Sequence, residues 1–212
     1  MADTYNNWEE LDAVQECGVD FDIYINRRNE DMIVLTPHGG GTEVGTSELV
    51  LGIAGSELSY YIFESTKPRD NDINHITSTN YDEPMAVDVV GRHRRALACH
   101  GFANEEGETR EYTIIGGADQ ELQERLYSHL AAAGFDVVYA DERFGGDDPK
   151  NIVNRTSTGM GAQLELSTWQ RKAFFTGYDW SKANRGNTTE VFDRYKNAVR
   201  AAIFLGETDV TE

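Results

Sequence analysis

A short apolar run that ends in a histidine and three glycines constrains this chain most. Met32-Ile33-Val34-Leu35 reads as a buried β-strand, and Thr36-Pro37-His38-Gly39-Gly40-Gly41-Thr42-Glu43 follows it directly. Because glycine reaches backbone conformations that other residues avoid, the chain can turn sharply and bring His38 and Glu43 toward one point. An imidazole nitrogen and a carboxylate oxygen there would supply two of the three protein ligands of a typical catalytic zinc site.

A second apolar segment ends in the same way. Residues 96–99 read as a buried strand, and His100-Gly101 follow it. This second strand-end histidine is the candidate for the third zinc ligand, beside His38 and Glu43. A site of three protein ligands leaves one position open for water, as catalytic zinc sites usually do.

The His-Gly-Gly-Gly string also occurs in lipases and esterases, where it forms an oxyanion hole. Those enzymes need a Gly-x-Ser-x-Gly nucleophile motif further along the chain. This chain has no such motif and no histidine after His129, so a serine esterase is disfavoured. The string would otherwise be a plain glycine-rich turn with a chance histidine and glutamate, and the second strand-end histidine argues against that.

Five blocks of residues, in this order, resemble the phage and bacterial poly-γ-glutamate hydrolases. They lie between about residues 20 and 205, and five ordered blocks are far more specific than any one of them. The blocks are Pro37-His38-Gly39-Gly40-Gly41-x-Glu43-x-Gly45-Thr46-Ser47-Glu48, His75-Ile76-Thr77-Ser78-Thr79 with Asp82-Glu83-Pro84, Cys99-His100-Gly101, Asn151-Ile152-x-Asn154-Arg155, and Gly161-x-Gln163-Leu164-Glu165-Leu166-Ser167.

The resemblance implies both a fold and a reaction. The fold is a zinc-carboxypeptidase-like mixed sheet, and the reaction is cleavage of γ-glutamyl amide bonds in poly-γ-glutamate, a capsule or slime polymer. By resemblance, Zn²⁺ is the cofactor and its ligands are His38, Glu43 and His100. The resemblance also makes Glu165 the general base, and it makes Arg155, together with Asn154, the holder of a substrate carboxylate.

Elementary chemistry agrees with these last roles. Glu165 alternates with two leucines, so on a strand it faces away from them and is free to take a proton from water. Arg155 offers a planar fork that binds a carboxylate through two hydrogen bonds, and every γ-linked glutamate carries a free α-carboxylate. The alternatives are an ordinary solvent-facing strand glutamate and a surface ion pair.

The chain is strongly acidic. It has 37 Asp and Glu residues against 19 Lys and Arg residues, which gives a net charge of −18. Such a charge destabilises a compact fold through self-repulsion, and molar salt screens that repulsion to a range of about 3 Å. The composition therefore favours a halophilic source, which would make this a haloarchaeal or haloarchaeal-virus member of the family. No basic patch is visible, which argues against nucleic-acid binding.

The order of apolar patterns predicts one α/β domain over residues 1–212, with helices on both faces of the sheet. Ligands in such sheets collect beyond the carboxyl ends of strands, where both strand-end histidines fall. We expect strands at residues 21–25, 32–35, 58–63, 73–77, 96–99, 112–115, 135–139 and 163–166.

Location and partners follow from what the sequence lacks. No stretch is long enough to span a membrane, and the first residues have neither the basic charge nor the apolar run of a secretory signal. The chain is therefore expected to be made in the cytoplasm and to reach an extracellular polymer by host lysis or on a virus particle. The alternative function is a virion component, in the tail or capsid, that retains the hydrolase fold for structure or receptor binding and contacts other virion proteins.

Overall fold

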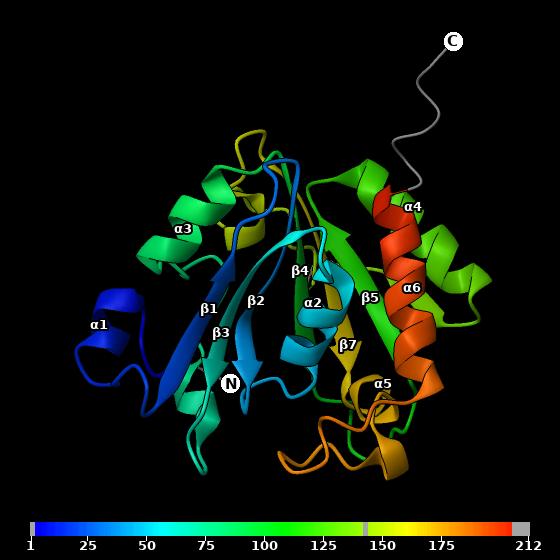
Figure 1. Cartoon of the computed structure of the whole chain (residues 1–212), viewed down its shortest axis with the longest axis horizontal. Coiled ribbons are helices and arrows are strands. Elements are labelled where there is room, and N and C mark those ends of the chain that lie inside the picture. The colour runs from blue at the N-terminus through cyan, green and yellow to red at the C-terminus, as the bar shows by residue number, and fades with distance from the viewer. Residues whose placement is uncertain (1–2, 142–143, 205–212) are drawn as a thin grey trace.

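The computed structural model describes residues 3–141 and 144–204, and within them the chain forms a twisted sheet of seven strands (Figure 1). The strand order across the sheet is β1-β3-β2-β4-β7-β5-β6. The strands are β1 (Phe21–Asn26), β2 (Met32–Gly40), β3 (Ser59–Ser65), β4 (Arg95–Phe102), β5 (Tyr112–Gly117), β6 (Asp136–Tyr139) and β7 (Met160–Ser167).

The four central strands are parallel. Neighbouring strands in the run β3-β2-β4-β7 pair in parallel, whereas β1 is antiparallel to β3 and β5 is antiparallel to β7. The sheet is therefore mixed, as predicted. Because β2, β4 and β7 point the same way, their carboxyl ends meet at one edge of the sheet.

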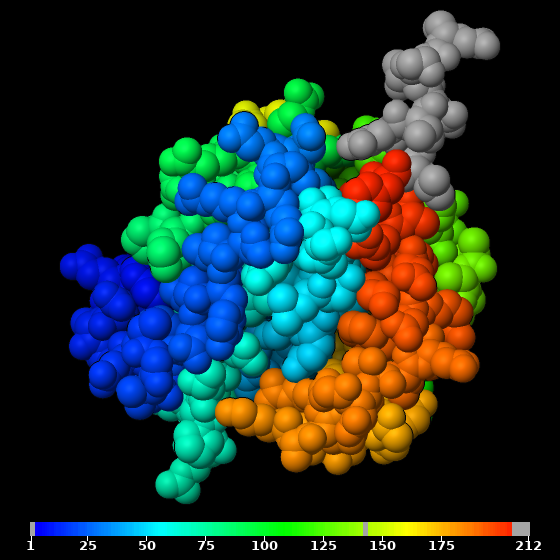
Figure 2. Space-filling view, viewed as in Figure 1, coloured from blue at the N-terminus to red at the C-terminus, as the bar shows by residue number. Residues whose placement is uncertain are grey.

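Helices cover both faces of this sheet, which confirms the predicted fold class. On one face lie α2 (Thr46–Ala54), α4 (Gln120–Ala132) and α6 (Glu190–Phe204), and on the other lie α1 (Trp8–Asp12) and α3 (Pro84–Gly91). Figure 2 shows α2 and α6 side by side over the first of these faces. The short helix α5 (Thr168–Ala173) follows directly after β7.

The alternation of side chains along β2 divides the core in two. Met32 and Val34 pack with the α2, α4 and α6 side, while Ile33 and Leu35 pack with the α1 and α3 side. All four side chains are buried, which explains why the sequence shows a continuous apolar run here. Among residues 3–141 and 144–204, no helix is long and apolar enough to cross a membrane.

Strand β2 runs further than the sequence predicts. It continues past Leu35 through the His-Gly-Gly segment to Gly40, and its pairing with β3 shifts register between Thr36 and Gly39. Gly40 has a φ of +67°, and a Cβ atom there would clash with the Ser65 carbonyl oxygen. The glycine is therefore required where the strand packs closely against β3 and turns toward Glu43.

The predicted strand at 73–77 is wrong. Asn71–Asn74 form a 3₁₀ helix, η1, and residues 75–77 belong to no strand. The backbone of residues 75–77 bonds to side chains instead of to a neighbouring strand. The Ile76 carbonyl lies against His38 Nε2, and the Thr77 N–H donates to Asp3. A segment this short has too few apolar residues for their spacing to distinguish a strand from irregular structure.

Candidate active site

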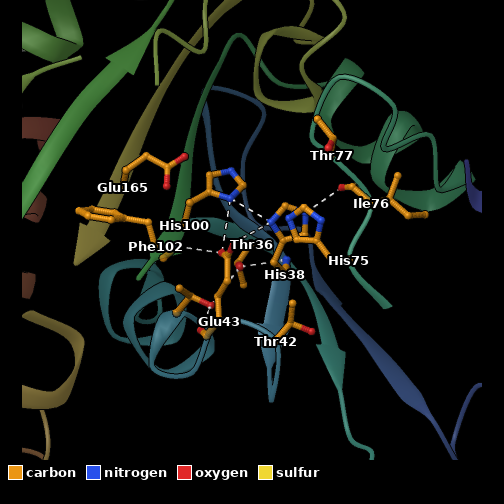
Figure 3. A network of polar contacts seen from close by, with 12 residues as sticks. Thr36, His38, Thr42, Glu43, His75, Ile76, Thr77, His100, Phe102 and Glu165 are labelled. Carbon is orange, nitrogen blue, oxygen red and sulfur yellow. Dashed lines mark hydrogen bonds and ion pairs between the residues drawn. The ribbon is translucent and has the colours of Figure 1, made fainter. Parts of the chain in front are cut away.

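Three of the predicted site residues meet at the carboxyl edge of the parallel strands (Figure 3). The Nδ1 atoms of His38 and His100 are 3.1 Å apart. The carboxylate of Glu43 lies 3.2 Å from His38 Nδ1 through Oε1 and 3.5 Å from His100 Nδ1 through Oε2. All three side chains are buried, with exposed fractions of 2%, 9% and 3% for His38, Glu43 and His100.

A tight turn after β2 brings Glu43 back to His38. The Glu43 N–H donates to the His38 carbonyl at 2.8 Å, which closes the turn, and helix α2 begins three residues later. The Glu43 carboxylate then accepts a hydrogen bond of 2.9 Å from the Gly101 N–H, the residue after the third candidate ligand. Glu43 is therefore bonded both to the segment that carries His38, through its N–H, and to the segment that carries His100, through its carboxylate.

The hydrogen bonds around His38 assign its tautomer. His38 Nε2 lies 2.8 Å from the Ile76 carbonyl oxygen, which can only accept, so Nε2 carries the proton. In a neutral imidazole this leaves Nδ1 with a free lone pair directed toward Glu43 and His100. Metal-binding histidines are commonly oriented in this way by a carbonyl on their second nitrogen.

The spacing of these donor atoms fits a tetrahedral zinc site. With Zn–N and Zn–O distances of about 2.0–2.1 Å, two ligand atoms of a tetrahedron are roughly 3.3–3.4 Å apart. The two Nδ1 atoms are 3.1 Å apart, and they lie 3.2 and 3.5 Å from the two different oxygens of the Glu43 carboxylate, which is close to that spacing. One carboxylate and two imidazoles are also a donor set that zinc accepts. His38, Glu43 and His100 could therefore hold the metal that the sequence predicts.

The electrostatics of the cluster favour a charged carboxylate. Burial by itself would raise the pKa of Glu43, but the adjacent His38 and His100 outweigh burial and hold that pKa well below its usual range. For His100, burial opposes protonation, and the neighbouring Glu43 and Glu165 carboxylates raise its pKa overall. The Glu43 carboxylate is thus anionic at ordinary pH, as a candidate metal ligand should be.

Glu165 lies on the next strand, directly beside His100. The two residues are register partners in the parallel β4–β7 ladder, so their side chains share one face of the sheet. Leu164 and Leu166 are buried on the opposite face, as the alternation predicts. The side chain of Gln163 donates to Glu165 Oε1 at 3.3 Å. Burial raises the pKa of Glu165 to about 7, which is suitable for a general base near neutral pH.

His38, Glu43, His100 and Glu165 line one cavity of about 600 Å³. Phe102 and Phe144 contribute apolar wall, while Asp3 and Asp72 contribute acidic groups. Arg171 is the only arginine or lysine among the described residues that line it.

A further histidine, which the sequence marked only as part of a family block, belongs to this site. The ring of His75 stacks on His38 with a centroid distance of 4.0 Å, and its Nδ1 lies 2.6 Å from Asp3 Oδ1. His38, Glu43 and His75 offer ligand atoms within 4.8 Å of one another. The position of His75 in a family block was the only sequence signal, and nothing in the sequence pointed to Asp3.

The predicted substrate-binding pair lies outside the residues that line the cavity. Arg155 donates to the carbonyl oxygens of Lys150 and Thr79, at 2.8 and 3.1 Å. Asn154 is buried, and its amide donates to the carbonyl oxygens of Gly146 and Asp148 at 2.7 and 2.9 Å. Both residues hold the loop before β7 in place, and their contact with substrate stays a prediction.

Fold and site together define an α/β protein with a candidate metal centre and a neighbouring carboxylate at the carboxyl edge of its parallel strands. Residues 5–198 match the poly-γ-glutamate hydrolase family, and the chain belongs to that family. Curated relatives from Bacillus subtilis (strain 168) include the SPbeta prophage-derived UPF0714 protein YoqZ, 38% identical over 92% of this chain and 69% of YoqZ. Another is the UPF0714 protein YmaC, 36% identical over 95% of this chain and 84% of YmaC.

Two solved structures share the whole architecture. A bacteriophage poly-γ-glutamate hydrolase superposes with a TM-score of 0.92 at 42% identity, over 95% of this chain and 97% of that protein. YndL in its zinc-free apo form superposes with a TM-score of 0.89 at 32% identity, over 97% of this chain and all of that one (100%). The N-formylglutamate amidohydrolase of Ralstonia eutropha JMP134 shares the fold alone, with a TM-score of 0.54 at 10% identity over 87% and 95% of the two chains.

Proposed function

We propose that this chain hydrolyses γ-glutamyl amide bonds of poly-γ-glutamate or a similar cell-surface polymer, with Zn²⁺ held by His38, Glu43 and His100. The observation that carries the proposal is the convergence of two Nδ1 atoms and the Glu43 carboxylate, at separations of 3.1–3.5 Å, beside the carboxylate of Glu165. The similar bacteriophage protein is a poly-γ-glutamate hydrolase, and the similar YndL structure is a zinc-free apo form, which supports zinc as the metal proposed here.

Glu165 performs the proton transfers in this proposal. When bound, zinc lowers the pKa of a water molecule to about 7 and polarises the carbonyl to be attacked. Glu165 takes a proton from the attacking water as the new C–O bond forms, and it delivers that proton to the amide nitrogen as the C–N bond breaks. The products are a carboxylic acid and an amine. Proton uptake and release at one carboxylate require a pKa near neutrality, which burial of Glu165 provides.

Arg155, with Asn154, is proposed to hold a substrate carboxylate. Arg155 follows the short 3₁₀ helix η2 (Ile152–Asn154), which packs against β7. Its donation to the Thr79 carbonyl links it to a residue that lines the cavity. A polymer chain extending from the cavity toward Thr79 would bring an α-carboxylate within reach of the guanidinium fork.

The proposed reaction is tested by incubating purified protein with poly-γ-glutamate in molar KCl, with and without a chelator. We expect shortening of the polymer and release of new amino groups, both abolished by the chelator and restored by added Zn²⁺. Folded protein that leaves the polymer intact but still retains it on a column would favour the virion component that binds without cleaving. Folded protein that neither cleaves nor retains the polymer would contradict both.

The net charge of −18 supports a halophilic source, which we include in the proposal as a haloarchaeal or haloarchaeal-virus origin. The prophage-derived relative YoqZ supports a viral connection and release by lysis or on a particle.

The same hydrolysis assay in dilute buffer tests the halophilic source. Activity and folded structure should both be lower there than in molar KCl, because self-repulsion of the acidic surface is then unscreened. Equal activity in dilute buffer and in molar KCl would contradict a halophilic source.

The pH profile of kcat/KM should report the ionisation of Glu165. Burial raises the pKa of this carboxyl from 4.5 to about 7, and a metal cation beside it favours the ionised form. The acid limb should therefore lie between these two values, with activity lost as pH falls because the base becomes protonated. Initial rates at low substrate concentration across that interval measure it. A profile that is flat there would remove Glu165 from the role of base.

A further inference from the structure

Arg171 is a buried arginine beside the candidate metal centre that the proposed chemistry leaves unexplained. It lies in α5, its exposed fraction is 5%, and it lines the cavity. Among the described residues it makes no ion pair, and burial lowers the pKa of its guanidinium although the nearby carboxylates of Glu43 and Glu165 oppose this effect. A buried cation next to a cation-binding site is costly, so its presence requires a compensating role.

The guanidinium donates to three backbone carbonyl oxygens and also lies over the Trp180 ring, with its Cζ 5.2 Å from the ring centroid. Nε donates to Leu166 at 3.2 Å, Nη1 donates to Val44 at 3.1 Å, and Nη2 donates to Phe102 at 3.1 Å. These acceptors belong to three separate segments, namely the turn before α2, the end of β4 and the end of β7. A single planar group therefore joins the turn before α2 to the ends of β4 and β7, which the sheet already pairs with each other.

Each of the three acceptors lies within two residues of a site residue. Val44 follows Glu43, Leu166 follows Glu165, and Phe102 is two residues after His100. Since the guanidinium is rigid and its N–H groups diverge at set angles, it determines the relative positions of the three carbonyls. The guanidinium thereby holds the turn that carries Glu43 in relation to His100 and Glu165, which the β4–β7 ladder places side by side.

Packing at Gly101 supports the same conclusion. A Cβ atom at Gly101 would overlap the Arg171 guanidinium, so the glycine is the reason that the fork can lie against the β4 backbone. The N–H of this same residue donates to Glu43 Oε2. The guanidinium thus lies against the peptide that holds the candidate ligand carboxylate.

We propose that Arg171 is the positioning residue of this site, and that its three carbonyl contacts align Glu43 and His100 as metal ligands with Glu165 beside them. The alignment of the metal ligands follows from the geometry of the chain. The role of Glu43 and His100 as metal ligands, and the catalytic consequence, rest on the proposed function.

The test compares three variants with a matched control. Arg171→Lys keeps the charge but loses the fork, Arg171→Met loses both, and Gly101→Ala keeps the arginine but displaces its guanidinium. The control is Arg200→Met, which removes an arginine of α6 that also donates to a backbone carbonyl, that of Ile53, away from the cavity. Zinc affinity is measured on folded protein by competition with a chromophoric chelator, and kcat and KM are measured separately.

We expect zinc affinity to fall about 10–100-fold in Arg171→Met, because this is the usual cost of losing a group that orients metal ligands. Zinc affinity should also fall in Arg171→Lys and in Gly101→Ala. We expect kcat to fall with KM little changed, and the control to match the original protein. If the charge alone mattered, Arg171→Lys would be unaffected and Arg171→Met would bind zinc more tightly. That outcome would overturn the proposal, as would lower thermal stability with unchanged zinc affinity and kcat. Because zinc binding is read without substrate, an inactive original protein would overturn the proposed function and leave this test intact.

Discussion

Glu165→Gln is expected to lower kcat by about 10²–10⁴-fold, the usual contribution of a general base, while zinc still binds. The substitution keeps the size and hydrogen-bonding capacity of the side chain beside His100 but removes its ability to take a proton. The three donor atoms that form the candidate metal centre belong to other residues and are untouched. Initial rates on poly-γ-glutamate, together with zinc content after dialysis, measure both parts of the expectation.

Glu106→Gln is the matched control, because Glu106 is an exposed glutamate in the loop between β4 and β5. It should behave as the original protein does, in rate and in zinc content. A Glu165→Gln protein with the original rate would show that another group takes the proton. An inactive one that had also lost zinc would show that Glu165 acts on the metal rather than on water.

His38→Ala is expected to lose zinc and activity together. His38 Nδ1 is the donor atom nearest to both other candidate ligands, at 3.1 Å from His100 and 3.2 Å from Glu43. Without it, only one imidazole and one carboxylate remain, which is too few for a closely held zinc ion. Activity should fall at least as far as in Glu165→Gln, and the zinc content of the dialysed protein should fall with it.

His129→Ala serves as the control for this experiment. His129 lies in α4, away from the residues that line the cavity, and it is only half-buried. That variant should keep both zinc and activity. Zinc retained at full stoichiometry by His38→Ala would show that His75, which stacks on His38, or another group replaces it. Activity retained without zinc would contradict a metal-dependent reaction altogether.

Much of the fold could be predicted because its signals are local. Apolar runs mark the buried central strands, and alternation in Gln163-Leu164-Glu165-Leu166 marks which side chain faces the cavity. Strand ends were less predictable. The sequence placed the end of β2 at Leu35, whereas the strand continues to Gly40 across a register shift. Pairing with β3 decides that boundary, and β3 is distant in sequence.

The candidate ligands could be predicted from the sequence because two of them lie at the ends of buried strands and the third follows a glycine-rich turn. His38 and His100 both occupy the carboxyl ends of neighbouring parallel strands, and the glycines between His38 and Glu43 permit the turn that returns the carboxylate. Their convergence therefore follows from two local patterns and one general property of parallel sheets.

The tertiary structure alone decided which other groups reach this centre. Asp3 and His75 are joined by a hydrogen bond between segments 72 residues apart, and Arg171 reaches Val44 across 127 residues. It also placed Arg155 beside Lys150 and Thr79 instead of in the cavity wall. Strand order and packing create these contacts, and neither has a local pattern. The sequence by itself determined which reactive side chains lie at the strand ends. The folded chain determined which distant side chains contact them.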